Sequence, residues 1–257
     1  MAEDVRAAGA LIEAWEERAF DPATAASTMI ENPFLQRPAP EPVHELIDQR
    51  FTQFTVLPAG GGERDVLALI SREARGNVRR AARRGVSVAL DNDAMAAVHQ
   101  VHVETMDRFG APPKSRRFFE AIPGELRAGE DFDIWTARVD GDLAAALLVI
   151  RFNGVSEYFA SGTRQGFRGY DPHAALVFAA MVHETRRGAR IWNWGGTRDG
   201  MDGVFHFKSK WGSRAGRYRY FVHVNDRSLR AAAPEELIAR FPGFYVIPFA
   251  SLRPRVA

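Results

Sequence analysis

The sequence of 257 residues has no cysteine, so it offers no disulfide bond, no thiolate metal site and no cysteine nucleophile. Neither charge predominates: 34 Lys plus Arg stand against 32 Asp plus Glu, for a formal net charge of +2. A basic binding surface can therefore arise only from the way the charges are distributed. No apolar run approaches the length of a membrane span, and Glu3 and Asp4 stand where a signal peptide would be basic. We therefore expect a soluble, cytoplasmic protein without a membrane span.

Three widespread catalytic motifs are also missing. The sequence has no G-x-x-x-x-G-K-[ST] and no strand-linked G-x-G-x-x-G, which argues against nucleotide hydrolysis and dinucleotide chemistry. It has no G-x-S-x-G, which argues against a serine nucleophile. His99 and His102 lie three residues apart on an expected helix, but no third ligand has a suitable spacing. We expect no metal site.

Hydrophobic periodicity predicts a sheet of mainly antiparallel strands flanked by helices. The expected helices cover residues 4–19, 65–84, 93–109, 115–128 and 171–187, and the expected strands cover residues 50–57, 86–90, 132–139, 143–152, 155–161, 191–194 and 218–224. Asp140-Gly141 and Asn153-Gly154 are strong hairpin turns that join three of these strands into a meander. The fold class is therefore α+β, a mixed α/β domain, and not a doubly wound sheet.

A basic stripe follows the expected helix 65–84. At about 100° per residue, four arginines share one narrow arc and two more flank it, while the apolar residues lie opposite. Guanidinium groups suit bidentate binding of phosphates, so the stripe is interpreted as a track for RNA or a phosphorylated substrate. A solvated helix face is the alternative. The residues expected to bind RNA are Arg72, Arg75, Arg79, Arg80, Arg83, Arg84 and Lys210.

The segment from Gly188 to Gly212 combines a short strand, a Gly195-Gly196 exit and an aromatic and basic stretch. Its glycines indicate a backbone that passes close to another part of the protein. Lys208 stands among aromatic residues after this exit, so it is a candidate holder of an anion or oxyanion. An ordinary amphipathic edge is the alternative.

The loop of residues 162–173 is a second candidate anion site. Gly166, Gly169, Arg164 and Arg168 precede a helix that begins near Asp171-Pro172, and helix N-termini favour anions. Asp171 at the N-cap would oppose an anion there. Three histidines border these loops and are candidate bases near neutral pH: His173, His183 and His206.

Several segments in this order resemble the Fem-type branch of the GNAT acyltransferase superfamily, which includes tRNA-dependent peptidoglycan-bridge aminoacyltransferases. They are REARGNVRRAARRGV (72–86), ETMDRFGAPPKSRRFF (104–119), VDGDLAAALLV (139–149), YFASGTRQGFRGYDPHAALVFAAM (158–181) and RGARIWNWGGTRDGMDGVFHFKSKWG (187–212). The resemblance covers about residues 50–225. It implies two GNAT-like units: a reduced unit of residues 1–78, joined by the tail 226–257, and a complete unit of residues 79–225.

The resemblance implies amide formation: a primary amine attacks an activated ester or thioester. Lys208 matches the family's F-K lysine and would supply positive charge, while Asp199, Asp202 or His206 would take the amine proton. The substrate-binding residues would be Arg79, Arg83, Tyr158, Arg164, Tyr170, Trp194, Gly195, Gly196, Phe207 and Trp211. Lys208→Ala is expected to abolish transfer and leave the fold intact.

The donor remains open at this point. Aminoacyl-tRNA with a small-molecule or peptide acceptor is the first hypothesis, and no resident cofactor is expected. An acyl-CoA or carrier-protein thioester is the alternative, but TRQGFRGYD does not reproduce the GNAT pyrophosphate loop Q/R-x-x-G-x-G/A. The third hypothesis is a non-catalytic RNA-binding GNAT relative.

Overall fold

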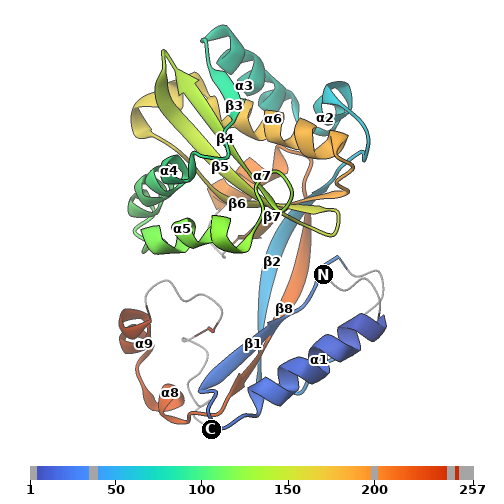
Figure 1. Ribbon diagram of the computed structural model, residues 1–257, viewed down its shortest axis with the longest axis vertical. Coiled ribbons are helices and arrows are strands. Elements are labelled where there is room, and N and C mark those ends of the chain that lie inside the picture. Colours follow the sequence, from blue (N-terminus) through green and yellow to red (C-terminus); the bar gives the residue numbers. More distant parts are fainter. Residues whose placement is uncertain (1–4, 35–39, 198–201, 242–246, 249–257) are drawn as a thin grey trace. The chain divides into compact units, whose positions relative to one another are not determined.

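The computed structural model describes residues 5–34, 40–197, 202–241 and 247–248 (Figure 1). Within these ranges eight strands form one mixed sheet in the order β1-β8-β2-β7-β6-β5-β4-β3. The strands are β1 (Ala26–Ile30), β2 (Leu46–Val56), β3 (Ser87–Leu90), β4 (Phe132–Val139), β5 (Asp142–Phe152), β6 (Val155–Thr163), β7 (Ile191–Thr197) and β8 (Arg214–Val224). The predicted mixed α/β class is confirmed.

The chain divides into two compact units. Unit 1 comprises residues 1–52 and 216–257, and unit 2 comprises residues 53–215. Unit 1 holds the helices α1 (Val5–Ala19), α8 (Ser228–Ala231) and α9 (Pro234–Arg240). The predicted division into residues 1–78 with 226–257 and residues 79–225 stays a prediction. No helix in the described part of the chain is long and apolar enough to cross a membrane.

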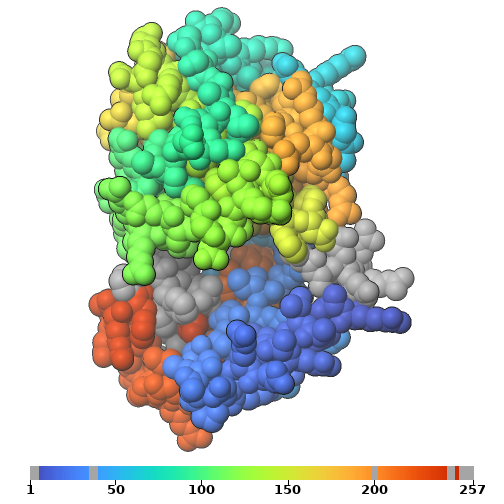
Figure 2. Space-filling view, viewed as in Figure 1, coloured from blue at the N-terminus to red at the C-terminus, as the bar shows by residue number. Residues whose placement is uncertain are grey.

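Unit 2 has helices on both faces of its strands (Figure 1). The space-filling view shows the surface of one of these helices, residues 116–125, in green (Figure 2). One core joins the strands to α2 (Glu63–Leu69), α3 (Arg72–Arg83) and α6 (Pro172–Arg186). The other core joins them to α4 (Met95–Arg108) and α5 (Arg116–Glu125). Successive strand residues alternate between the two cores: Trp135 and Leu147 pack in the first, Ile134 and Leu148 in the second. This alternation is the period of two that a strand requires.

The single helix predicted at residues 65–84 was wrong, because the chain breaks between α2 and α3. Ile70 is extended, and the Ser71 hydroxyl caps α3 by accepting a hydrogen bond from the Ala74 amide at 3.1 Å. Arg75 Nη1 donates to the carbonyls of Leu67 at 3.0 Å and Ile70 at 2.7 Å, satisfying the end of α2. The Ser71 cap therefore begins a second helix, whereas the hydrophobic spacing continues through this position and predicts a single helix.

β6 and α4 approach closely at Gly162. A Cβ at this position would lie 2.4 Å from both the Val101 carbonyl oxygen and Thr105 Oγ1. Gly162→Ala is expected to lower the free energy of unfolding by about 1–3 kcal/mol, because a backbone carbonyl cannot rotate away. Urea denaturation measures this loss. Gly166→Ala, at a position open to solvent, is the matched control, and equal losses in both variants would contradict the predicted close approach.

Candidate active site

The two parallel strands β6 and β7 diverge in the middle of unit 2. They pair from Val155 with Ile191 to Glu157 with Asn193, and among the described residues of both strands the register goes no further. β6 continues along β5, so the β7 backbone beyond Asn193 needs partners other than β6. The candidate site is built around these backbone groups.

Lys208 donates hydrogen bonds to the backbone carbonyls at the end of β7. It belongs to α7 (Asp202–Ser209), a helix that the sequence patterns do not predict, and it is 4% exposed. Its Nζ donates to the carbonyls of Gly195 at 3.1 Å and Gly196 at 3.0 Å, and to Thr197 Oγ1 at 2.9 Å. Burial lowers the pKa of Lys208 from its ordinary value of 10.5 to about 8. Lys208 is therefore a buried cation whose three ammonium hydrogens are bonded to groups of the chain itself.

Polar residues of β2 hold this arrangement. Thr197 Oγ1 donates to Gln53 Oε1 at 3.3 Å, and Gln53 Nε2 donates to the Phe205 carbonyl at 3.1 Å and to Ser213 Oγ at 3.0 Å. A buried amide with both ends bonded fixes the position of its neighbours. Gln53 thereby links the end of β7 to both ends of the segment that carries Lys208. Sequence patterns gave no sign of this role.

Aromatic rings line the α6 side of the divergence. His173 stacks on Phe207, with ring centroids 5.3 Å apart and planes 7° apart, and the Tyr158 ring lies 5.2 Å from that of Trp194. Tyr158 Oη is 2.7 Å from His173 Nε2 and accepts a hydrogen bond from Ser161. Tyr158 therefore donates to His173.

Burial keeps this tyrosine–histidine pair neutral. It lowers the pKa of His173 to about 4, assisted by the charge of Arg108, and it raises the pKa of Tyr158 above its usual value. A histidine with so low a pKa is a weak base at neutral pH. The pair serves as a neutral polar anchor in an aromatic wall, so His173 is a poor candidate for the base.

The structure brings together most of the residues predicted in the segment from Gly188 to Gly212, called the closing segment below. Lys208, its glycine partners and four aromatic residues meet around β7: Tyr158, Trp194, Phe207 and Trp211. It does not bring the predicted bases to Lys208. Asp202 and His206 are exposed, and His206 lies about 200° around α7 from Lys208. Asp199 lies outside the described residues.

The remaining predicted substrate contacts lie elsewhere on unit 2. Arg164 pairs with Glu104 at 3.2 Å, and Tyr170 is exposed on the 3-10 turn η1 (Gln165–Tyr170). Arg79 and Arg83 are exposed on α3. Their roles as substrate contacts stay predictions.

Some cations of the predicted basic stripe are exposed, and others form tertiary contacts within the protein. Arg72, Arg79, Arg83 and Arg84 are exposed. Three of the predicted RNA contacts have partners within unit 2: Arg75 caps α2, Arg80 pairs with Asp171, and Lys210 pairs with Glu73 at 2.6 Å. These partners come from other elements, so helical spacing could not reveal them.

The glycines of the closing segment have two different causes. Gly195 has a φ of +68° and open space where a Cβ would stand, so backbone conformation, and not close approach, requires glycine there. The close approach predicted for this segment is found at Gly212, where a Cβ would lie 2.7 Å from the Leu69 carbonyl oxygen. The prediction was therefore wrong at Gly195 and is confirmed at Gly212.

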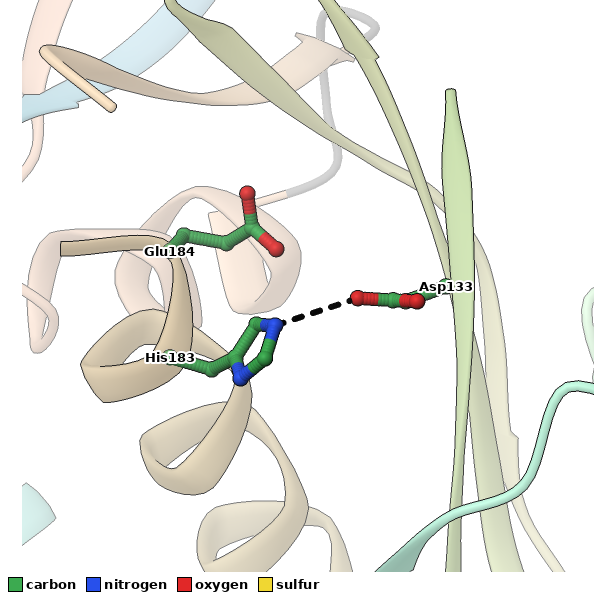
Figure 3. Close-up of side chains that lie close together, drawn as sticks. All are labelled: Asp133, His183 and Glu184. Carbon is green, nitrogen blue, oxygen red and sulfur yellow. Dashed lines mark ion pairs between the residues drawn. The ribbon is translucent and has the colours of Figure 1, made fainter. Parts of the chain in front are cut away.

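A separate ionic cluster lies under α6. Asp133 of β4 and His183 and Glu184 of α6 bring ligand atoms within 4.8 Å of one another (Figure 3). Arg151 already joins the two carboxylates: its Nε lies 2.7 Å from Glu184 Oε2, and its Nη2 pairs with Asp133. Ser156 donates to Glu184 at 2.6 Å. Because one guanidinium bridges both carboxylates, we interpret the cluster as a structural ionic network, and His183 belongs to it rather than to the site at β7.

These features fit a recognised domain. The sequence profile of the acetyltransferase (GNAT) domain matches residues 71–209, more than half of the chain, so the chain belongs to the GNAT acetyltransferase family. Among solved structures it is similar to FemX, with a TM-score of 0.65 and 15% identity over 89% of this chain and 79% of FemX. The predicted GNAT-like fold is confirmed.

Two further structures show weaker similarity. L-PGS from Bacillus licheniformis gives a TM-score of 0.49 and 13% identity over 78% of this chain and 67% of that chain. The ribosomal-protein-S18-alanine N-acetyltransferase from Escherichia coli gives 0.41 and 13% over 54% and 94%. No curated protein matches the sequence significantly.

Proposed function

We propose that this GNAT acyltransferase forms an amide bond by moving an aminoacyl group from aminoacyl-tRNA to a primary amine of a small molecule or peptide. The observation that carries the proposal is the buried Lys208 cation at the divergence of β6 and β7. Amine attack on an ester carbonyl builds negative charge on the carbonyl oxygen. A fixed cation in a poorly solvated site stabilises that charge more than water does.

The surroundings of α6 favour an RNA ester over acyl-CoA. The Asp171 carboxylate lies at the first turn of α6, held by Arg80, and it would repel a pyrophosphate at this helix start. The exposed arginines of α3 offer cations to a longer polyanion. Because charged tRNA is made and used in the cytoplasm, the proposal also places the reaction there.

The donor can be tested directly. The protein is incubated with a mixed amine pool and, in separate reactions, with charged tRNA, RNase-treated charged tRNA and acetyl-CoA, and amides are detected by mass spectrometry. The proposal expects product only with intact charged tRNA. Product with acetyl-CoA alone would replace it with an acyl-CoA-dependent transferase. RNA binding without product from any donor would indicate a non-catalytic relative.

The exposed part of the α3 stripe is expected to bind tRNA. Replacing Arg72, Arg79 and Arg83 with glutamine should weaken binding and lower the magnitude of the slope of log K against log salt by about 2–3, since each phosphate contact contributes roughly 0.7 in single strands and 0.9 in B-DNA. Arg75 is left unchanged, because its loss would uncap α2. Filter binding at several salt concentrations gives the slope.

A charge-matched control separates the stripe from net charge. Arg64, Arg117 and Arg187 are exposed on other parts of unit 2, and their triple glutamine variant loses the same charge. The control should keep the wild-type slope. Equal slopes for both triple variants and the wild type would show that the stripe makes no phosphate contact.

A further inference from the structure

The candidate site holds a carboxyl group that the predicted mechanism does not use. Glu157 is the last β6 residue paired with β7, opposite Asn193. Its cross-strand partner on β5 is Ile150, which packs with the α4 and α5 core, so Glu157 lies on that face of the sheet. Its side chain is partly exposed, so a substrate can reach it.

A chain of hydrogen bonds connects Glu157 to Lys208. The Asn193 side chain bonds to the Glu157 carboxyl, and Asn193 Oδ1 accepts from the Gly195 amide at 3.0 Å. The Gly195 carbonyl then accepts from Lys208 Nζ at 3.1 Å. A carboxylate and an ammonium are thus held at the two ends of one short stretch of β7, at the point where the strands part.

We propose that Glu157, oriented by Asn193, is the general base that takes the proton of the attacking amine. This inference rests on the proposed acyl transfer. The neutral amine attacks the donor carbonyl and forms the C–N bond, and the Glu157 carboxylate accepts the N–H proton of the adduct. The C–O bond of the donor ester then breaks, and the proton passes from Glu157 to the leaving oxygen. Lys208 faces the charge on the carbonyl oxygen throughout.

The environment of Glu157 strengthens its carboxylate as a base. Burial raises its pKa above the usual value, and the hydrogen bond from Asn193 opposes this rise. The helices packed on this face, α4 and α5, and the loop between them carry these ionisable groups: His99, His102, Glu104, Asp107, Arg108, Lys114, Arg116, Arg117, Glu120 and Glu125. None of them is among the causes of the shift. A raised carboxyl pKa makes Glu157 a stronger base than a carboxylate with the ordinary glutamate pKa.

The test is the pH profile of kcat/KM with charged tRNA and the amine acceptor that the donor assay identifies. Glu157→Gln, which keeps the shape and removes the base, should lower kcat about 100-fold or more and leave only the acid limb that protonation of the acceptor amine causes. Glu120→Gln, which removes an exposed carboxylate from α5, is the control and should match the wild type. Wild-type turnover in Glu157→Gln would overturn the inference.

A second variant provides a readout that a purely structural role would not move. Asn193→Ala removes the bond that favours the carboxylate, so the pKa of Glu157 should rise and the acid limb that Glu157 sets should shift to higher pH. A uniform fall in rate with an unmoved limb would assign Asn193 to structure and contradict the proposal. Absence of product from the wild type with every donor would instead reject the proposed function, which separates the two failures.

Discussion

Lys208→Met is expected to lower kcat/KM for acyl transfer by about 100–1000-fold, the usual cost of removing one group that stabilises an oxyanion. Methionine keeps the length and packing of the buried stem but removes the charge at the end of β7. Steady-state kinetics with saturating acceptor measures the effect. Arg117→Met removes an exposed cation from α5 and should leave the rate unchanged. A Lys208→Met rate within a few-fold of the wild type would remove Lys208 from the mechanism.

The same variant needs a stability measurement. The expectation that Lys208→Ala leaves the fold intact stays a prediction, and the burial of Lys208 argues against it. Alanine would leave a cavity and three acceptors without their donor. The folded pKa of about 8 lies below the unfolded value of 10.5, so the unfolded state binds more protons between these values. Wild-type stability should therefore gain up to about 3 kcal/mol from pH 8 to 10.5, a gain that Lys208→Met lacks.

Arg151→Met should have the largest effect on stability, lowering the free energy of unfolding by about 3–5 kcal/mol. It would leave the carboxylates of Asp133 and Glu184, 1% and 0% exposed, without their shared cation. Urea denaturation measures the loss. The triple variant Arg151→Met, Asp133→Asn, Glu184→Gln removes all three charges and should recover most of it. A triple variant as unstable as the single one would show that packing, not charge, is responsible.

Sequence patterns predicted those parts of the fold that local chemistry controls. Both hairpin turns are confirmed, with positive φ at Asp140, Gly141, Asn153 and Gly154, as their type of turn requires. The break between α2 and α3 was not predicted, because the apolar spacing continues through Ser71. β1 was not predicted, because its five residues, ASTMI, show no clear alternation and form a strand by pairing with β8.

The site was predictable only in part. The glycines and aromatic residues of the closing segment pointed to Lys208 as a candidate. The partners of Lys208 are backbone carbonyls, which no sequence pattern reveals. Glu157 had a usable signal: a carboxylate inside the strand VSEYFAS, among residues that a central strand buries. Gln53 had none, because its role depends on contacts with residues more than 150 positions away.

Those distant contacts decide when the site can form. Gln53 bonds to residues 152 to 160 positions later in the chain, and Thr55 bonds to the Trp211 carbonyl 156 positions later. Closing loops of this length costs chain entropy before any contact offsets it. On the ribosome, β2 is made early but cannot hold α7 until the segment around Lys208 has emerged. The candidate site can therefore be completed only late in the synthesis of unit 2, and a chain that ends before Phe205 lacks all three groups to which Gln53 Nε2 donates.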